Sequence, residues 1–264
     1  MSAQNPAPRG VDPSIPNIAR MYDYWLGGKD NFAADREAAE KIVEISGGRV
    51  LRGVRLNRAF LRRAVRTATA AGVRQFLDLG SGLPTQDNVH QVAGSGARVV
   101  YADYDPVVRA HGQALLTGVD GVAVIEADLR RPAEILEHPH VKGLIDFDEP
   151  VAILFVAVLH FVHDEYDPAG LVARFGAAVA PGSHLILSHL ARDAFPDKMA
   201  ETEQVYEKSS AGLVARPRAE ILRFFDGFEL LEPGLVGPTE WRPEELNPWS
   251  GEKFAGLVGV GRKP

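Results

Sequence analysis

The chain has 264 residues, carries a formal net charge of −6 and contains no cysteine. The absence of cysteine excludes disulfides, thiolate zinc sites and cysteine nucleophiles. The negative charge argues against a nucleic-acid-binding protein that works by neutralising phosphates.

The first residues carry no targeting signal. Residues 1–14 are rich in proline and alanine, and we expect them to be disordered. They lack the apolar core of a signal peptide, and nowhere in the chain is there an apolar stretch long enough to span a membrane. We therefore expect a cytoplasmic protein without a membrane partner.

A helical segment precedes the first strand. Apolar residues at helical spacing predict one helix that starts near Ile15 and ends at Gly27-Gly28, a second over residues 31–45, and a third over residues 52–71. The third helix carries a row of arginines on its other face, which we interpret as a solvated face: Arg58, Arg62, Arg63 and Arg66. We expect residues 15–72 to form a cap on a core that spans residues 73–264, the two making one compact unit.

The core begins with a short apolar run, residues 75–79, that ends in Gly80-Ser81-Gly82. Such a run predicts a strand buried on both faces, and the glycines let a ligand approach the backbone of the turn. Thr85 stands where a dinucleotide fingerprint needs its third glycine, and no Gly-Lys-Ser or Gly-Lys-Thr follows, which excludes a P-loop. We expect a nucleotide-like cofactor over the turn, although turn geometry alone would also explain the glycines.

Two later apolar runs end in acids. Asp103 follows Gly82 by about twenty residues, so its carboxylate should reach the hydroxyls of a ribose. Asp128, after the next run, should lie beside the same crevice and accept a hydrogen bond from an adenine amino group. Two such carboxylates suit a ligand with ribose, adenine and positive charge, and they suit pyrophosphate badly. The alternative is that both are helix N-caps, although Asp105-Pro106 resembles a cap in its own right.

The remaining elements alternate as in βαβ units. Helices are predicted over residues 88–93, 105–116, 130–137, 167–179, 200–213 and 217–225. Residues 144–147 form a short apolar island before the fourth strand (151–157), and a fifth strand covers residues 183–190. Residues 228–231 and 254–260 are predicted to form the last two strands, which pair in an antiparallel manner. This alternation predicts an α/β protein with a mostly parallel sheet.

The motifs together resemble a known family. Asp78 to Gly82, Asp103 to Pro106 and Ala127 to Leu129 are similar to the first three motifs of the S-adenosylmethionine-dependent methyltransferases with the Rossmann-like fold. A closer resemblance is to the bacterial S-adenosyl methyltransferase family, once a domain of unknown function. It rests on longer segments: residues 22–32, 75–85, 88–90, 156–162 and 180–183.

The resemblance implies a fold and a cofactor. The fold would be a seven-stranded Rossmann-like sheet, mostly parallel with an antiparallel last strand, with helices on both faces and the N-terminal helices as a lid. The cofactor would be S-adenosyl-L-methionine. Its predicted binding residues are Gly80, Ser81, Gly82, Asp103, Tyr104, Asp128, Leu129 and Ala157, together with Tyr22, Tyr24 and Asn31 of the cap, where Lys29 or Asn31 would meet the cofactor carboxylate.

The loop after the fourth strand would lie next to the methyl group. Histidine titrates near neutrality, so His160 is the first candidate for a base and His163 the next, with His189 and His90 behind them. Alternatively, His160 orients this loop by hydrogen bonding. A metal site is disfavoured because these histidines and the nearby acids lack a ligand-like arrangement, and a hydrolase has no Gly-x-Ser-x-Gly elbow.

The leading hypothesis is therefore a methyltransferase acting on a small-molecule acceptor. A non-catalytic S-adenosylmethionine sensor is one alternative, and an NAD-dependent oxidoreductase is another that Thr85 and Asp128 speak against. The sequence leaves the acceptor and the oligomeric state open.

Overall fold

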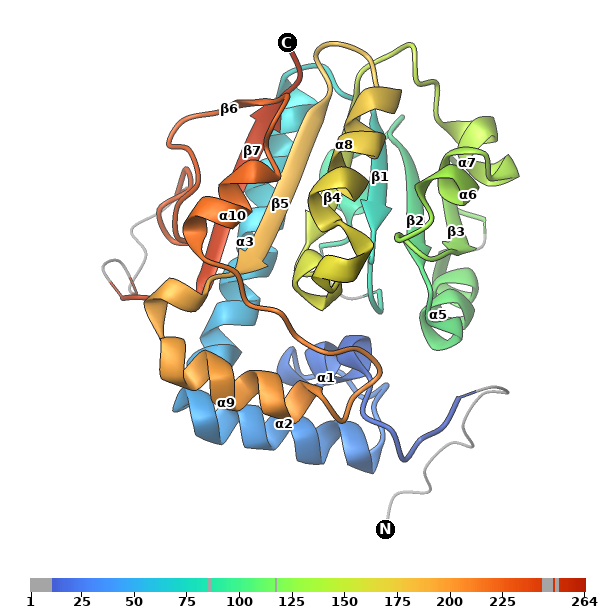
Figure 1. Ribbon diagram of the computed structural model, residues 1–264. Coiled ribbons are helices and arrows are strands. Elements are labelled where there is room, and N and C mark those ends of the chain that lie inside the picture. Colours follow the sequence, from blue (N-terminus) through green and yellow to red (C-terminus); the bar gives the residue numbers. More distant parts are fainter. Residues whose placement is uncertain (1–10, 85–86, 117, 244–248, 250–251) are drawn as a thin grey trace.

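The structure is a computed structural model that describes residues 11–84, 87–116, 118–243, 249 and 252–264. In this part of the chain, seven strands form one sheet in the order β3-β2-β1-β4-β5-β7-β6 (Figure 1). The strands are β1 (Gln75–Leu79), β2 (Arg98–Asp103), β3 (Val122–Glu126), β4 (Val151–Val156), β5 (His184–Leu190), β6 (Glu229–Leu230) and β7 (Gly256–Arg262). Residues 1–10 of the expected disordered segment, and Thr85, lie outside the described residues.

The pairing of the strands confirms the expected Rossmann-like sheet. β1 pairs in parallel with β2 and β4, β2 with β3, and β4 with β5. β7 runs antiparallel to both β5 and β6, so it is the reversed strand of the sheet. The predicted closing pair is thus present, with only two residues in β6.

The strands at the centre of the sheet are buried on both faces, as their unbroken apolar runs predict. All five residues of β1 are buried, and so are the first five of β4. Two apolar cores result, one on each face of the sheet. These cores fix the carboxyl ends of β1, β2 and β4 relative to one another.

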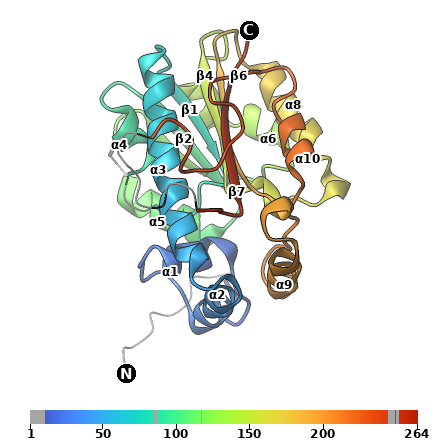
Figure 2. The same ribbon diagram turned by 90° about the vertical axis from the view of Figure 1, so that its left-hand side faces the viewer.

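Helices cover both faces (Figure 2). One face carries α3 (Arg49–Ala70) and α4 (Val89–Ala93), with α5 (Pro106–Leu116) against β3. The other face carries α6 (Pro132–Leu136), α7 (Pro139–Leu144), α8 (Pro168–Ala178) and α10 (Arg218–Arg223).

A third apolar cluster lies at the carboxyl ends of the parallel strands. It joins α1 (Ile18–Trp25), α2 (Ala33–Ser46), the start of α3, and α9 (Pro196–Tyr206). Figure 1 shows α1, α2 and α9 together beneath this end of the sheet. We call these helices, with the first half of α3, the cap. α9 comes from the far half of the sequence, so the cap is not made of the N-terminal residues alone.

Two helices differ from the sequence prediction. The helix predicted over residues 200–213 is α9, which starts at Pro196 and ends at Tyr206. Proline suits the first helical turn, and beyond Tyr206 the chain leaves the helix and the Ser210 amide bonds to the carbonyl of Pro16 at 2.8 Å. The apolar island at residues 144–147 contains the end of α7, a helix that the sequence reading did not predict.

Candidate functional site

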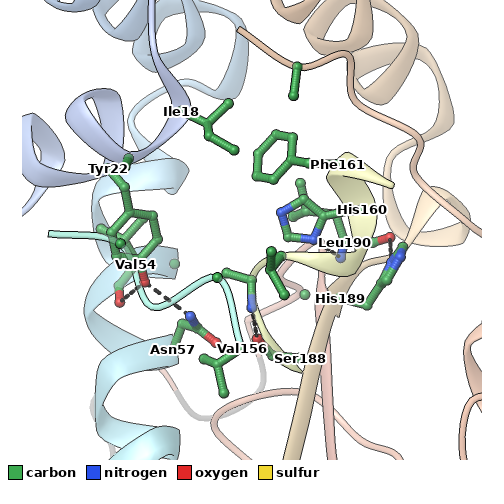
Figure 3. A pocket seen from close by; sticks show the side chains of 18 of the residues that line it. Ile18, Tyr22, Val54, Asn57, Val156, His160, Phe161, Ser188, His189 and Leu190 are labelled. Carbon is green, nitrogen blue, oxygen red and sulfur yellow. Dashed lines mark hydrogen bonds between the residues drawn. The ribbon is translucent and has the colours of Figure 1, made fainter. Parts of the chain in front are cut away.

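A cavity of about 310 Å³ opens between the cap and the carboxyl ends of β1, β2, β4 and β5. Its lining runs without interruption from the glycine turn after β1 to the aromatic side chains of the cap. This is the edge at which ligands bind in open parallel sheets. Figure 3 shows the cap side of this cavity, where Tyr22 and Asn57 face His160 and Phe161 across the space.

The glycine turn is held to the neighbouring strand by its backbone. Gly80 N–H donates to the carbonyl of Ala102 at 2.8 Å, and Gly82 N–H donates to the Asp103 carboxylate at 2.9 Å. Both glycines have positive φ, +70° and +66°, which other residues adopt only with strain. A Cβ on Gly80 would lie 2.2 Å from Val158 Cγ2, whereas one on Gly82 would meet no atom within 4 Å. Gly82 therefore borders open space in the cavity.

Asp103 lies at the end of β2 with its carboxylate against this turn. Its other oxygen accepts from the Asp105 amide at 3.0 Å. Burial raises the pKa of Asp103 to about 6, although these backbone donors act against the shift. Asp105 accepts from the Val107 amide at 2.7 Å at the start of α5, so Asp105 and not Asp103 has the capping role. The second oxygen of Asp105 is buried without a partner among the described residues.

Asp78 places a second buried carboxyl in the cavity. No hydrogen-bond partner of its side chain is found in the described part of the chain. Burial raises its pKa to about 7, and the nearby charge of Arg58 acts against that shift. Arg58 lines the cavity and donates to the carbonyl of Asp87 at 3.0 Å, so this member of the arginine row does not lie on a solvated face. The sequence reading missed both roles, although an acid inside an apolar strand was a signal for Asp78.

Asp128 also lines the cavity, beside Leu129 and Tyr104. Arg130 binds its carboxylate through two nitrogens, at 2.9 and 2.7 Å. Desolvation works against ionisation of Asp128, but the bonds from Arg130 outweigh it and lower its pKa. The carboxylate also accepts from the Arg130 amide, a turn contact that lies ahead of α6. The Tyr104 hydroxyl donates to Ser210 Oγ at 3.3 Å and so reaches the chain beyond α9.

Ala157, the first residue after β4, has an unusual conformation. Its φ of +58° falls in the left-handed region, which is uncommon for any residue but glycine. Its amide donates to Ser188 Oγ at 2.9 Å, which holds the strained peptide in place (Figure 3). Strain of this kind concentrates at functional sites, and Ala157 lines the cavity together with the glycine turn and the residues of the cap.

Of the three residues near the N-terminus that were predicted to bind the cofactor, only one lies in the lining of the cavity. Tyr22 lines the cavity, and its hydroxyl accepts from Asn57 at 3.0 Å and donates to the carbonyl of Val54 at 3.3 Å. Tyr24 and Asn31 do not line it. The Tyr24 hydroxyl bonds to Glu40, and the Asn31 amide donates to Asp23 and accepts from Arg36.

Tyr22 and Tyr24 separate because residues two apart on a helix point in different directions, whereas Asn31 lies in the loop between α1 and α2. The charged side chain of Lys29 is likewise exposed and outside the lining. Neither Lys29 nor Asn31 is therefore placed to meet a cofactor carboxylate, contrary to the expectation from the sequence.

The two histidines proposed as a base also differ in their position relative to the cavity. His160 is buried in the lining, whereas His163 is exposed and outside it. Burial lowers the pKa of His160 well below its usual value, so its ring is neutral at neutral pH. Leu190 N–H donates to His160 Nδ1 at 3.4 Å, an arrangement that places the ring proton of the neutral form on Nε2. The runner-up His90 bonds to the Tyr101 hydroxyl and is not in the lining.

Arg216 fixes the loop that carries His160. Its buried guanidinium donates to the carbonyls of Leu159 and Val162 at 3.0 and 2.8 Å and to His189 Nε2 at 3.1 Å. Burial lowers the pKa of His189 to about 3, so this ring accepts from the guanidinium as a neutral group. The guanidinium also pairs with Asp164 at 2.6 Å. The sequence gives no local signal for Arg216, because it lies more than fifty residues from this loop.

The geometry fits a sulfonium nucleoside. Open space at Gly82 and the carboxyl-bearing residues Asp78, Asp103 and Asp128 all line the same cavity. Carboxyls there can accept from hydroxyl and amino groups and favour positive charge. Within the described ranges, no three acidic or histidine side chains gather as metal ligands, and no helix is long and apolar enough to cross a membrane.

Comparisons with known proteins agree with this geometry. The model of a family described as S-adenosyl methyltransferase matches residues 4–264. A protein from Thermobifida fusca YX assigned as a methyltransferase is 42% identical, with a TM-score of 0.91 over 97% of this chain and 98% of its own. A DUF574 family protein from Streptomyces avermitilis MA-4680 is 37% identical, with a TM-score of 0.90 over 96% and 99%.

A more distant likeness concerns the fold alone. The S-adenosylmethionine-dependent methyltransferase SibL, solved in its apo form, is 18% identical with a TM-score of 0.51, over 82% of this chain and 57% of its own. No curated protein matches the chain.

Proposed function

The chain belongs to the S-adenosyl methyltransferase family, and from that premise we propose that it transfers the methyl group of S-adenosylmethionine to a small-molecule acceptor held under the cap. The observation that carries the proposal is the continuous cavity, which joins the glycine turn to the cap across Ala157. A donor on one side and an acceptor on the other would meet there at near-attack distance, which is the main requirement of an in-line displacement.

The sheet side of the cavity would hold the cofactor. Gly82 gives the ligand close access to the backbone, Asp103 would accept from the ribose hydroxyls, and Asp128 would accept from the adenine amino group. Asp78 would face the amino group of the methionine part, and Arg58 beside it would face the carboxylate. The bound cofactor supplies an electrophilic methyl group on a positively charged sulfur.

The cap side would position the acceptor. His160 is neutral, and its Nε2 proton makes it a hydrogen-bond donor toward the cavity in the tautomer that Leu190 favours. We therefore propose His160 as a group that orients an acceptor atom and not as the base that deprotonates it. Methyl transfer to a neutral nitrogen or to an already ionised oxygen needs no base.

A direct test uses labelled donor. The purified full chain is incubated with trideuteromethyl S-adenosylmethionine and a filtered extract of small metabolites, and the products are searched by mass spectrometry for the added label. We expect labelled small molecules that depend on the protein. If the protein binds S-adenosylmethionine but no extract gives a labelled product, the transferase function fails and a non-catalytic binding protein replaces it.

Gly82→Ala is the informative variant, and Gly94→Ala is its matched control. Both glycines have positive φ and neither added Cβ would meet an atom within 4 Å, so both substitutions introduce backbone strain without a steric overlap. Only Gly82 lines the cavity. We expect Gly82→Ala to lose labelled product and cofactor binding, and Gly94→Ala to keep both.

A further inference from the structure

We propose that the acceptor is an uncharged, mainly apolar ring compound, an inference that rests on the proposed function. The part of the cavity beyond His160, here called the acceptor chamber, is lined by uncharged and mostly apolar side chains: Ile18, Val54, Phe161, Leu190, Met199 and Tyr206. Figure 3 shows Ile18 of α1 and Phe161 facing each other across this chamber. Burying an apolar surface there is favourable, and aromatic walls favour a flat partner.

The polar groups of the chamber are uncharged. The Tyr206 side chain is only 4% exposed, and its hydroxyl has no hydrogen-bond partner among the residues that the structure describes. Burial raises the pKa of Tyr206, so this hydroxyl stays protonated. His160 is neutral for the same physical reason, and Asn57 carries no charge. The chamber thus offers an acceptor a few neutral hydrogen bonds and no counter-ion.

The charged groups at the cap side of the lining are already engaged. Arg49 stacks over the ring of Phe195, at 5.0 Å from its centre, and Lys198 pairs with Glu201 at 3.1 Å. The carboxylate of Asp23 accepts from the Asp30 amide at 3.0 Å and from an amide nitrogen of Asn31. A ligand that brought its own charge into the chamber would have to draw one of these groups away from its present contact or leave the charge unpaired, and either is costly in an apolar site.

Two dyes with the same ring system test the charge requirement. N-phenyl-1-naphthylamine is uncharged, and 8-anilino-1-naphthalenesulfonate adds a sulfonate to the same rings; both fluoresce more strongly in apolar surroundings. They are titrated into the full chain saturated with S-adenosylhomocysteine. We expect one uncharged dye to bind per chain and the sulfonate dye to bind at least about tenfold more weakly.

Variants locate the dye. Ile18→Trp should fill the chamber and weaken the uncharged dye about tenfold or more, with unchanged affinity for S-adenosylhomocysteine. Leu222→Trp makes the same kind of change on the exposed surface of α10 and should leave both ligands unaffected. If Ile18→Trp does not fold, as judged by loss of S-adenosylhomocysteine binding, Val54→Phe on α3 replaces it with the same expectation.

The outcomes separate the two proposals. If the wild type binds S-adenosylhomocysteine but binds the two dyes equally, binds neither, or binds the uncharged dye equally well in the filled variants, the acceptor class is wrong and the transferase proposal stands. If the wild type does not bind S-adenosylhomocysteine, the transferase proposal fails and the acceptor class fails with it.

Discussion

Acidification from about pH 7 to pH 5 should weaken the binding of S-adenosylhomocysteine through Asp103. Its carboxyl is buried at the end of β2 and has a pKa raised to about 6, so it is largely protonated at pH 5. Ribose hydroxyls donate best to an ionised carboxylate, so the protein must lose this proton to bind.

The size of the effect follows from the pKa. At pH 5, one unit below the pKa of Asp103, only about one molecule in eleven has this carboxyl ionised. The affinity for S-adenosylhomocysteine at pH 5 should therefore be about tenfold lower than at a pH well above 6, a loss of about 1.4 kcal/mol of binding free energy. Asp78, with a pKa raised to about 7, adds a second proton if it too must ionise to meet the ligand amino group.

The assay is isothermal titration calorimetry with S-adenosylhomocysteine, repeated in buffers of different ionisation enthalpy so that released protons are counted. Asp103→Asn should bind more weakly and lose one proton from the count, and Asp78→Asn should lose the other. An affinity that is constant from pH 5 to 7.5, or a pH dependence that is undiminished in Asp103→Asn, would refute the reasoning.

Three further substitutions probe the packing around the site. Gly80→Ala should cost roughly 2–5 kcal/mol of unfolding free energy, since strain at positive φ adds to the overlap with Val158, and urea denaturation measures it. Arg216→Ala should cost roughly 3–5 kcal/mol of unfolding free energy, because it leaves buried carbonyls unpaired. Asp164→Ala removes the mostly exposed partner of Arg216 and should cost less than about 1 kcal/mol. Equal losses of stability in thermal melts of the two variants would contradict this. Asp78→Asn should raise the stability of the ligand-free protein at pH 8 more than at pH 4, because a folded-state pKa raised above 3.8 means that stability is lost as pH rises through about 7.

The sheet side of the site was predictable because its signals are local. A short apolar strand, a glycine turn and an acid at the next strand end lie within about thirty residues of sequence, and parallel strands bring their carboxyl ends to one edge. Gly82 and Asp103 therefore meet as expected, joined by a backbone hydrogen bond. The parallel pairing among β1 to β5 follows from the same alternation of apolar runs and helices, whereas the order of the strands in the sheet does not follow from it.

The cap side was less predictable because helix rotation and long-range packing decide it. Tyr22 and Tyr24 are two residues apart and point in different directions, and no local pattern tells which one faces the cavity. Arg58 and Arg63 belong to an arginine row that resembles a solvated face, yet Arg58 lies near Asp78 and Arg63 donates to the carbonyls of Pro238 and Trp241. Arg216 reaches its loop only through the fold.

The two halves of the cavity are therefore specified by different physical means. The sheet side, which we propose holds the cofactor, is fixed by hydrogen bonds from backbone amides at the strand ends, such as the bond from Gly82 N–H to the Asp103 carboxylate, and it cannot vary without disturbing the sheet. The chamber side is shaped by side chains of α1, α3 and α9, such as Ile18, Val54 and Met199, which can change volume while the donor position stays fixed. Substitutions in the cap should thus alter which acceptor fits and leave cofactor affinity unchanged, the separation that the dye and nucleoside titrations measure.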